Sequence, residues 1–80
     1  MAKSLHKKYP DRTVLFKFGK RLAYLRNAQG LTQEKLAEQS SVSVKYIQML
    51  EGKDPNAPTL IKLNELADGL SIPLWKLLKL

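Results

Sequence analysis

The 80-residue sequence predicts an all-α fold made of five helices. Apolar residues recur at intervals of three and four along several segments, as they do on the buried stripe of an amphipathic helix. Hydroxyl residues that can cap a helix precede these segments, and glycine or proline separates them. A chain of this length makes one domain, in which folding buries only about 60–65% of the surface that the unfolded chain exposes.

The first predicted helix spans residues 14–28. Four apolar residues at 3-4-3 spacing form its buried stripe: Leu15, Phe18, Leu22 and Leu25. Gly30 follows the last helical residue and ends the helix. Residues 1–13 precede this helix as a basic N-terminal tail, so the predicted domain comprises residues 14–80.

The next two helices are short and are joined by a tight turn. The first begins after Thr32 and the second after Ser43, and each side-chain hydroxyl can accept a hydrogen bond from an amide of the first turn. Ala37 lies where the two helix axes would cross, and its small side chain lets them approach closely. Two short capped helices separated by a tight turn are typical of a helix-turn-helix that binds DNA.

The second of these helices, residues 43–51, has two distinct faces. Ile47 and Leu50 lie on one face and are expected to be buried, together with Val42 just before the helix. The other face carries four residues that can read DNA bases: Val44, Lys45, Gln48 and Met49. Glutamine suits N6 and N7 of adenine, lysine suits O6 and N7 of guanine, and valine can contact a thymine methyl. Two alternatives stay open, since Lys45 could bind phosphate instead and Met49 could belong to the domain's own packing.

Two further helices complete the predicted scaffold. A turn-rich connection at residues 54–58 leads to Thr59, which can cap a fourth helix. Four residues of that helix are expected to face inward: Leu60, Leu63, Leu66 and Ala67. Gly69 closes the helix. A short last helix begins near Pro73, because proline is favoured in a first turn, and three residues supply its inward stripe: Leu74, Leu77 and Leu78.

These residues resemble the phage repressor/Cro-like (XRE-like) helix-turn-helix family. The resemblance covers about residues 18–78 and rests on an ordered series of caps, core positions and turns: Gly30-Leu31-Thr32-Gln33-Glu34-Lys35-Leu36-Ala37, Val42-Ser43, Tyr46-Ile47, Leu50-Glu51 and Pro58-Thr59-Leu60-x-x-Leu63-x-x-Leu66-Ala67. It implies a compact five-helix, repressor-like domain that places its third helix in the major groove of DNA. Two turns depart from the family pattern. Ser41 replaces a left-handed glycine, and Glu51-Gly52-Lys53 replaces the commoner Glu-x-Gly, which predicts a reshaped exit from the third helix.

The resemblance also implies roles for residues outside the third helix. Gln33 is expected to contact the DNA backbone and to brace the third helix, since its amide can donate to a phosphate oxygen. Three more residues belong to the region that runs beside the phosphates: Lys53, Asn56 and Thr59. Arg26 and Glu51 match the pair of charges that links the first helix to the third. The alternatives are an ordinary solvated glutamine at Gln33 and a plain polar loop for the residues beside the phosphates. For the pair of charges the alternative is two independent solvated side chains, because exposed ion pairs contribute only about 0–1 kcal/mol.

The excess of positive charge is confined to the N-terminal part of the sequence. Residues 1–26 hold eight basic residues and one acidic residue, whereas residues 27–80 hold six of each. The N-terminal charges can lie along phosphates and displace counterions. The alternative for the tail is a solubilising, disordered end. Binding to an anionic membrane is a weaker alternative, because the tail lacks a periodic apolar face.

The composition argues against several other classes of protein. A sequence without cysteine forms neither a disulfide nor a thiolate metal site, and it favours a reducing, cytoplasmic location. Its apolar runs fall far short of the roughly 20 residues that span a bilayer, and no secretion signal follows Met1. His6 is the single histidine, and no spacing of carboxylates suggests acid–base chemistry. We therefore expect no enzyme activity, cofactor, metal or small-molecule ligand.

The last helix contains the candidate dimer interface. Trp75 lies off the inward stripe, and with Leu80 it can form an exposed apolar patch. The alternative is that Trp75 folds back onto the first helix.

The sequence as a whole predicts a sequence-specific, double-stranded-DNA-binding transcriptional regulator, a small bacterial or phage repressor or controller protein that acts as a homodimer on a palindromic site. The alternative function is a protein-interaction module on the same fold, such as an antitoxin-like or adaptor protein.

Overall fold

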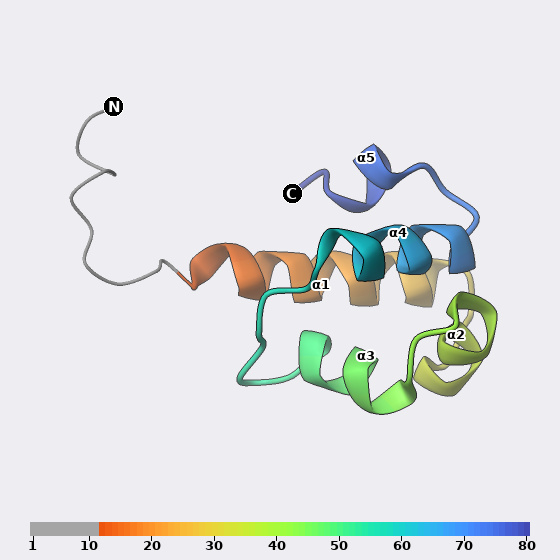
Figure 1. Cartoon of the computed structure of the whole chain (residues 1–80), viewed down its shortest axis with the longest axis horizontal. Helices are drawn as coiled ribbons and strands as arrows, with labels where there is room; N and C mark the ends of the chain where they lie inside the picture. Colours follow the sequence, from red (N-terminus) through yellow and green to blue (C-terminus); the bar gives the residue numbers. More distant parts are fainter. Residues whose placement is uncertain (1–11) are drawn as a thin grey trace.

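The computed structural model describes residues 12–80, which form five helices and no strand (Figure 1). The helices are α1 (Thr13–Ala28), α2 (Gln33–Ser40), α3 (Val44–Glu51), α4 (Leu60–Gly69) and α5 (Leu74–Leu77). The predicted all-α class and the helix-turn-helix formed by α2 and α3 are therefore confirmed. Most of the predicted tail, residues 1–11, lies outside the described residues, and its last residue, Thr13, belongs to α1.

Three hydroxyl residues cap the helices as predicted. Thr32 Oγ1 accepts a hydrogen bond of 3.0 Å from the amide of Lys35 at the start of α2. Ser43 and Thr59 repeat this contact at the starts of α3 and α4, at 3.0 and 3.1 Å. Each cap satisfies an amide that the helix itself leaves unpaired and contributes about 1 kcal/mol. The caps therefore define where the helices near the predicted DNA interface begin.

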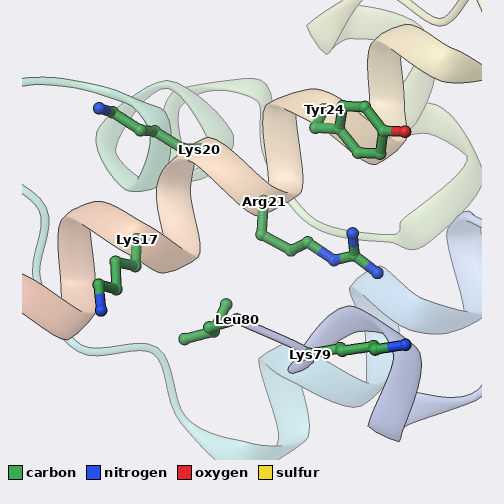
Figure 2. A pocket seen from close by; sticks show the side chains of 6 residues that line it. All are labelled: Lys17, Lys20, Arg21, Tyr24, Lys79 and Leu80. Carbon is green, nitrogen blue, oxygen red and sulfur yellow. The ribbon is translucent and has the colours of Figure 1, made fainter.

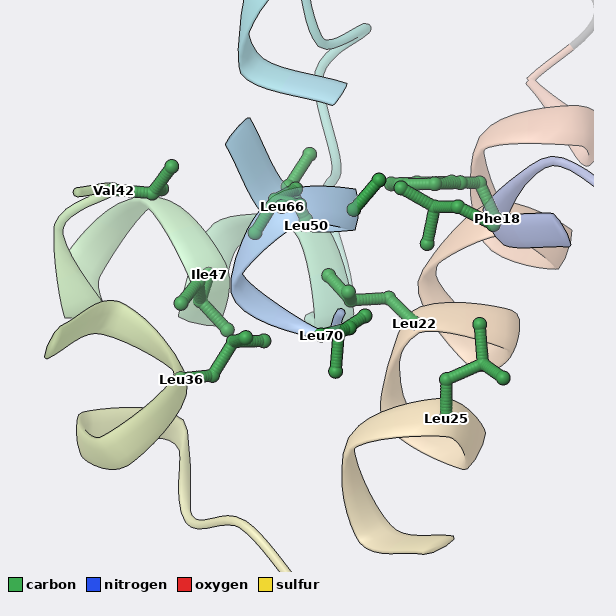
Figure 3. Close-up of a cluster of buried hydrophobic side chains, with 11 residues drawn as sticks. Phe18, Leu22, Leu25, Leu36, Val42, Ile47, Leu50, Leu66 and Leu70 are labelled. Atoms are coloured by element: carbon green, nitrogen blue, oxygen red, sulfur yellow. The ribbon is translucent and has the colours of Figure 1, made fainter. Parts of the chain in front are cut away.

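The core brings together apolar residues from all five helices (Figure 3). Leu22 of α1 and Ile47 of α3 are fully buried, together with Leu36 of α2 and Leu66 of α4. α1 packs on α3, and α2 packs on both α3 and α4, while α5 closes the other side against α4 and α1. This packing fixes the helix-turn-helix on a rigid scaffold, with α3 and α5 on opposite sides of the domain (Figure 1).

Two glycines allow helices to approach closely. A Cβ atom on Gly19 would lie 2.3 Å from the carbonyl oxygen of Leu50, so α1 and α3 can pack at this distance only without a side chain there. A Cβ on Gly69 would lie 2.5 Å from Cβ of Ser40, where α4 meets α2. The sequence predicted a close approach of two helices at Ala37, and it predicted Gly69 only as the residue that closes the fourth helix. Gly69 is indeed the last residue of α4, and its close packing against α2 also requires a residue without a side chain at this position.

The inward stripe of α4 differs from the prediction at one end. Leu60 is 68% exposed, so its predicted burial is wrong. Leu60 lies on the outer face, beside a surface hollow that it shares with Ile61 and Leu74. Leu70 is fully buried instead, because it follows Leu66 by four residues and so continues the buried face past the end of the helix.

Four other leucines are less buried than predicted, and of these Leu63 and Leu74 are partly buried and still pack against the core. Leu15 is only partly buried, because it lies in the first turn of α1, where Pro58 and Leu63 border a shallow apolar hollow. Leu78 is 40% exposed, since α5 ends at Leu77 and Leu78 leaves the inward face of the helix. Among the helices of the described residues, none combines the length and the apolar character needed to cross a membrane.

The turns follow the prediction in their main features. Gly30 ends α1 with a positive φ of 71°. Ser41 takes the left-handed conformation (φ 62°) at the turn of the helix-turn-helix, which costs a residue other than glycine about 1–2 kcal/mol. Gly52 is extended (φ −91°, ψ −161°), so α3 ends without a left-handed glycine. A Cβ on Gly52 would lie 2.8 Å from the carbonyl oxygen of Gln48, so the reshaped exit also requires glycine.

Candidate nucleic-acid interface

A buried ion pair ties α1 to the end of α3. Arg26 Nε donates to Glu51 Oε2 at 2.9 Å, and Nη2 of the same guanidinium donates to Oε1 at 2.9 Å. The two side chains are only 12% and 8% exposed, so the loss of either partner would leave a largely buried charge unpaired, which is not the case for an exposed pair. The hydrogen bond to Glu51 raises the pKa of Arg26 above its ordinary value. Arg26 Nη1 also donates to the carbonyl oxygen of Leu31 at 2.8 Å and so holds the turn that leads into α2.

Gln33 joins the same network from α2. Its amide Nε2 donates to Glu51 Oε1 at 3.0 Å. This bond orients the side chain at the first residue of α2 and leaves the second amide hydrogen for another acceptor. Because a carboxylate accepts but cannot donate, the bond also assigns the nitrogen rather than the oxygen of the amide to the side facing Glu51. The network therefore fixes the start of α2 relative to the end of α3.

The outward face of α3 carries the four predicted base-reading residues, of which two are exposed and two are partly buried. Lys45 and Gln48 are exposed, and they lie three residues apart on one face of the helix. Val44 and Met49 are partly buried at the edges of this face. Gln48 offers a paired donor and acceptor, and Lys45 offers a mobile cation. This arrangement can bind the edges of bases or a phosphate.

Met49 connects α3 to the following loop. Its Sδ lies 3.1 Å from the amide nitrogen of Asn56, which donates to it, and the side chain packs against the core. Met49 thus takes part in the domain's own packing, the alternative that the sequence left open. An edge of the side chain is still accessible to a ligand that lies along α3.

The loop between α3 and α4 carries the predicted backbone-binding residues. Lys53 and Asn56 are exposed on this loop. Thr59 is also exposed, and its hydroxyl oxygen accepts the capping bond from Lys62, so its hydrogen can donate to another group. The loop and the start of α4 together offer cationic and hydroxyl groups next to α3.

Arg12 has a role that the sequence did not predict. It was expected only as a charge of the tail, but Arg12 Nη2 donates to Asp54 Oδ1 at 2.8 Å and to the carbonyl oxygen of Pro55 at 2.6 Å. Pro55 is buried, so these bonds fasten the loop to the start of α1. No local pattern could have found this contact, because its partners lie 42 and 43 residues away along the chain.

The predicted dimer residues lie away from the helix-turn-helix. Trp75 is 66% exposed on α5 and therefore does not fold back into the core. Leu80 is 53% exposed and lies over α1, in a groove that also contains Tyr24 (Figure 2). Residues 12–80 contain no group of three or more histidine, aspartate or glutamate side chains placed to hold a metal ion.

Comparison with known proteins agrees with this geometry. The helix-turn-helix family matches residues 22–74. The structure is similar to the restriction-modification controller protein C.AhdI from Aeromonas hydrophila, with 38% sequence identity and a TM-score of 0.73 over 79% of this chain and 94% of that chain. It is also similar to a mutant of the restriction-modification controller protein C.Esp1396I, with 25% identity and a TM-score of 0.74 over 85% of this chain and 93% of that chain. The comparison with curated proteins gave no match. The chain therefore belongs to the XRE-like helix-turn-helix family of DNA-binding transcriptional regulators.

Proposed function

We propose that this protein is a controller of restriction-modification genes that binds a specific palindromic DNA site as a homodimer, with α3 in the major groove. The similarity to the controller proteins C.AhdI and C.Esp1396I supports the class of genes, and the observation that carries the reading of DNA by α3 is the network of Arg26, Gln33 and Glu51. It holds α2 and α3 in a fixed relation while Lys45 and Gln48 point outward from α3. A rigid reading helix supports sequence recognition, because base contacts need fixed geometry.

Gln48 and Lys45 are the proposed base readers. A glutamine amide can form two bonds to adenine at N6 and N7, and lysine can bind O6 or N7 of guanine. Val44 is suited to a thymine methyl at the edge of the same face. Met49 would contribute an apolar edge to the groove and would keep the loop in place through Asn56.

Contacts to the DNA backbone would surround this helix. The free amide hydrogen of Gln33, the ammonium of Lys53, the side chain of Asn56 and the hydroxyl of Thr59 can each donate to phosphate oxygens. Gln33 opens α2 and Thr59 caps α4, so the partial positive charge of two helix starts would add to these donors. Such contacts would fix the register of α3 without reading sequence.

The proposed dimer uses exposed apolar side chains of α5 and its neighbouring segments, outside the reading helix α3. Trp75 is the proposed centre of the interface, with Leu80 at its edge, because large exposed aromatics are frequent interface anchors. Exposed Leu60 and Ile61 of α4 would enlarge this surface. Two recognition helices in such a dimer would lie about 34 Å apart, one turn of DNA, and would therefore require a palindrome.

Selection of bound fragments from random double-stranded DNA tests this function. We expect enrichment of an inverted repeat whose half-sites are centred about one helical turn apart. Binding should also weaken steeply as salt rises, since phosphate contacts release counterions. A selection that enriches no sequence would contradict the proposal and would favour the protein-interaction module instead.

A further inference from the structure

A shallow groove of about 470 Å³ runs between α1 and the C-terminal segment, and none of the proposed DNA contacts uses it. We call it the α1–α5 groove, and six residues line it: Lys17, Lys20, Arg21, Tyr24, Lys79 and Leu80 (Figure 2). The lining contains four cations and no carboxylate side chain. A surface of this kind has a strong preference for anionic partners.

Most of the groove faces away from the reading helix, and Lys20 is the lining residue that also borders a hollow at the end of α3. Gly19 and Arg26 are two of the α1 residues that contact α3, and Lys17 and Tyr24 precede them by two positions each. Two positions on an α-helix correspond to a rotation of about 200°, so Lys17 and Tyr24 point to the opposite side of α1. α5 lies on this side of the domain and α3 on the other (Figure 1). A partner in the groove and DNA on α3 could therefore be bound at the same time.

The cations of the groove are not neutralised within the described part of the chain. The four ion pairs found there engage Arg12, Arg26, Lys35 and Lys62, none of which lines the groove. Exposed Lys76 adds a further cation on α5. Like charges gathered on one surface repel one another, so the cluster does not arise from a requirement of the fold.

One cation of the groove is held in place. Arg21 donates to the carbonyl oxygen of Lys76 through Nε at 3.3 Å and Nη2 at 2.9 Å. Its guanidinium carbon lies 5.8 Å from the centre of the Tyr24 ring. This arrangement fixes a charge beside an aromatic ring that is 64% exposed. A fixed arginine next to an exposed aromatic is the kind of site that dominates protein–protein interfaces.

The apolar part of the groove indicates whether its anionic partner is a DNA backbone or an acidic segment of a protein. Tyr24 and Leu80 expose apolar surface between the cations. A DNA backbone supplies phosphates but no apolar group to cover that surface. An acidic protein segment with an aliphatic or aromatic side chain supplies both, as helical segments do when they lay an apolar stripe into a groove. The chemistry of the lining therefore favours a protein partner.

We infer that the α1–α5 groove is a docking site for an acidic segment of another protein, with an apolar side chain of that segment seated on Tyr24, beside the edge of the proposed dimer interface at Leu80. The cations around the groove select the acidic segment and speed its approach. The site is independent of base recognition, so a regulator bound to its DNA site would still present the groove to a partner.

The direct test measures binding of a short fluorescein-labelled peptide that contains glutamates and aspartates around two leucines. The protein variants are Lys17→Gln/Lys79→Gln, in the groove, and the matched control Lys35→Gln/Lys62→Gln, which removes the same charge elsewhere. We expect the groove variant to bind the peptide at least about tenfold more weakly than the control variant does. A second peptide, with both leucines replaced by glutamine, should bind wild-type protein more weakly than the first.

Three further measurements make the outcome decisive. In wild-type protein, peptide addition should shift the backbone NMR signals of Tyr24 and Leu80 but not that of Gln48. Specific DNA binding should be equal in the groove and control variants, which separates this inference from the proposed function. Absence of saturable peptide binding, equal affinity of the two variants for the peptide, or no dependence on the leucines would overturn the inference. It would also be overturned if the groove lysines affected binding of random duplex DNA rather than of the peptide.

Discussion

Gln33 donates a hydrogen bond of 3.0 Å to the carboxylate of Glu51, which joins the first residue of α2 to the last residue of α3. The same carboxylate is paired with Arg26 of α1. Glu51 therefore accepts bonds from two other helices at the point where α3 leaves the proposed DNA interface. A single substitution there should affect both the stability of the domain and the position of Gln33.

We predict that Glu51→Ala lowers the free energy of unfolding by roughly 3–5 kcal/mol, because it leaves the buried guanidinium of Arg26 without its counter-charge. Urea denaturation followed by circular dichroism measures this loss. Glu38→Ala is the matched control, since the Glu38 side chain is 70% exposed and its pair with Lys35 should contribute about 0–1 kcal/mol. Equal effects of the two substitutions would show that the buried network does not stabilise the fold.

Gly19→Ala should destabilise the domain by about 1–3 kcal/mol, because the new methyl group would force α1 and α3 apart. The steric reason is the 2.3 Å distance between a Cβ at this position and the carbonyl oxygen of Leu50. Ala23→Gly provides the comparison on α1, where only helix propensity changes, at about 1 kcal/mol. Thermal unfolding of both variants checks the prediction, and a Gly19→Ala protein as stable as wild type would contradict the close approach.

The basic tail is tested by deleting residues 1–11 rather than 1–12, since Arg12 holds the loop at Asp54 and Pro55. The deletion removes Lys3, Lys7 and Lys8 along with Asp11. If each lysine meets one phosphate, the slope of log affinity against log salt should become shallower by up to about 3. Affinity should fall equally for specific and random DNA. An unchanged slope would mean that the tail only improves solubility.

Trp75→Ala should weaken the dimer, because truncation of a central aromatic often costs at least about 2 kcal/mol of binding free energy. Sedimentation of the free protein at micromolar concentration measures this effect. Tyr24→Ala is the control, since Tyr24 is an equally exposed aromatic on α1. A wild-type protein that stays monomeric both free and on DNA would contradict the proposed dimer. A Trp75→Ala protein that dimerises normally would contradict the proposed interface at Trp75.

The sequence predicted those features that depend on neighbouring residues. Thr32, Ser43 and Thr59 cap their helices through amides only three residues away. The left-handed turn at Ser41 was implied by the resemblance to the helix-turn-helix family, which usually has a left-handed glycine at this position. In each case the physical cause lies within one turn of helix, so the local pattern was sufficient.

Other features depend on contacts between distant segments, and the sequence did not reveal them. The bonds from Arg12 to the loop and the packing of Gly19 on Leu50 arise only when α1 lies against α3. Leu70 is buried in the core and Leu60, which was predicted to be buried, is exposed; this difference depends on how α4 is rotated against its neighbours. The α1–α5 groove likewise brings Lys17 and Lys79 together from opposite ends of the described chain.

The most direct test of base reading by α3 is the ratio of affinities for the selected DNA site and a scrambled duplex. We predict that Gln48→Ala and Lys45→Ala each lower this ratio, by about 1–3 kcal/mol for a lost base contact. Gln39→Ala and Lys35→Ala, on α2, should leave it unchanged, and all four proteins should unfold at similar temperatures. If both α3 variants keep the full discrimination of the wild-type protein, then α3 does not read the bases.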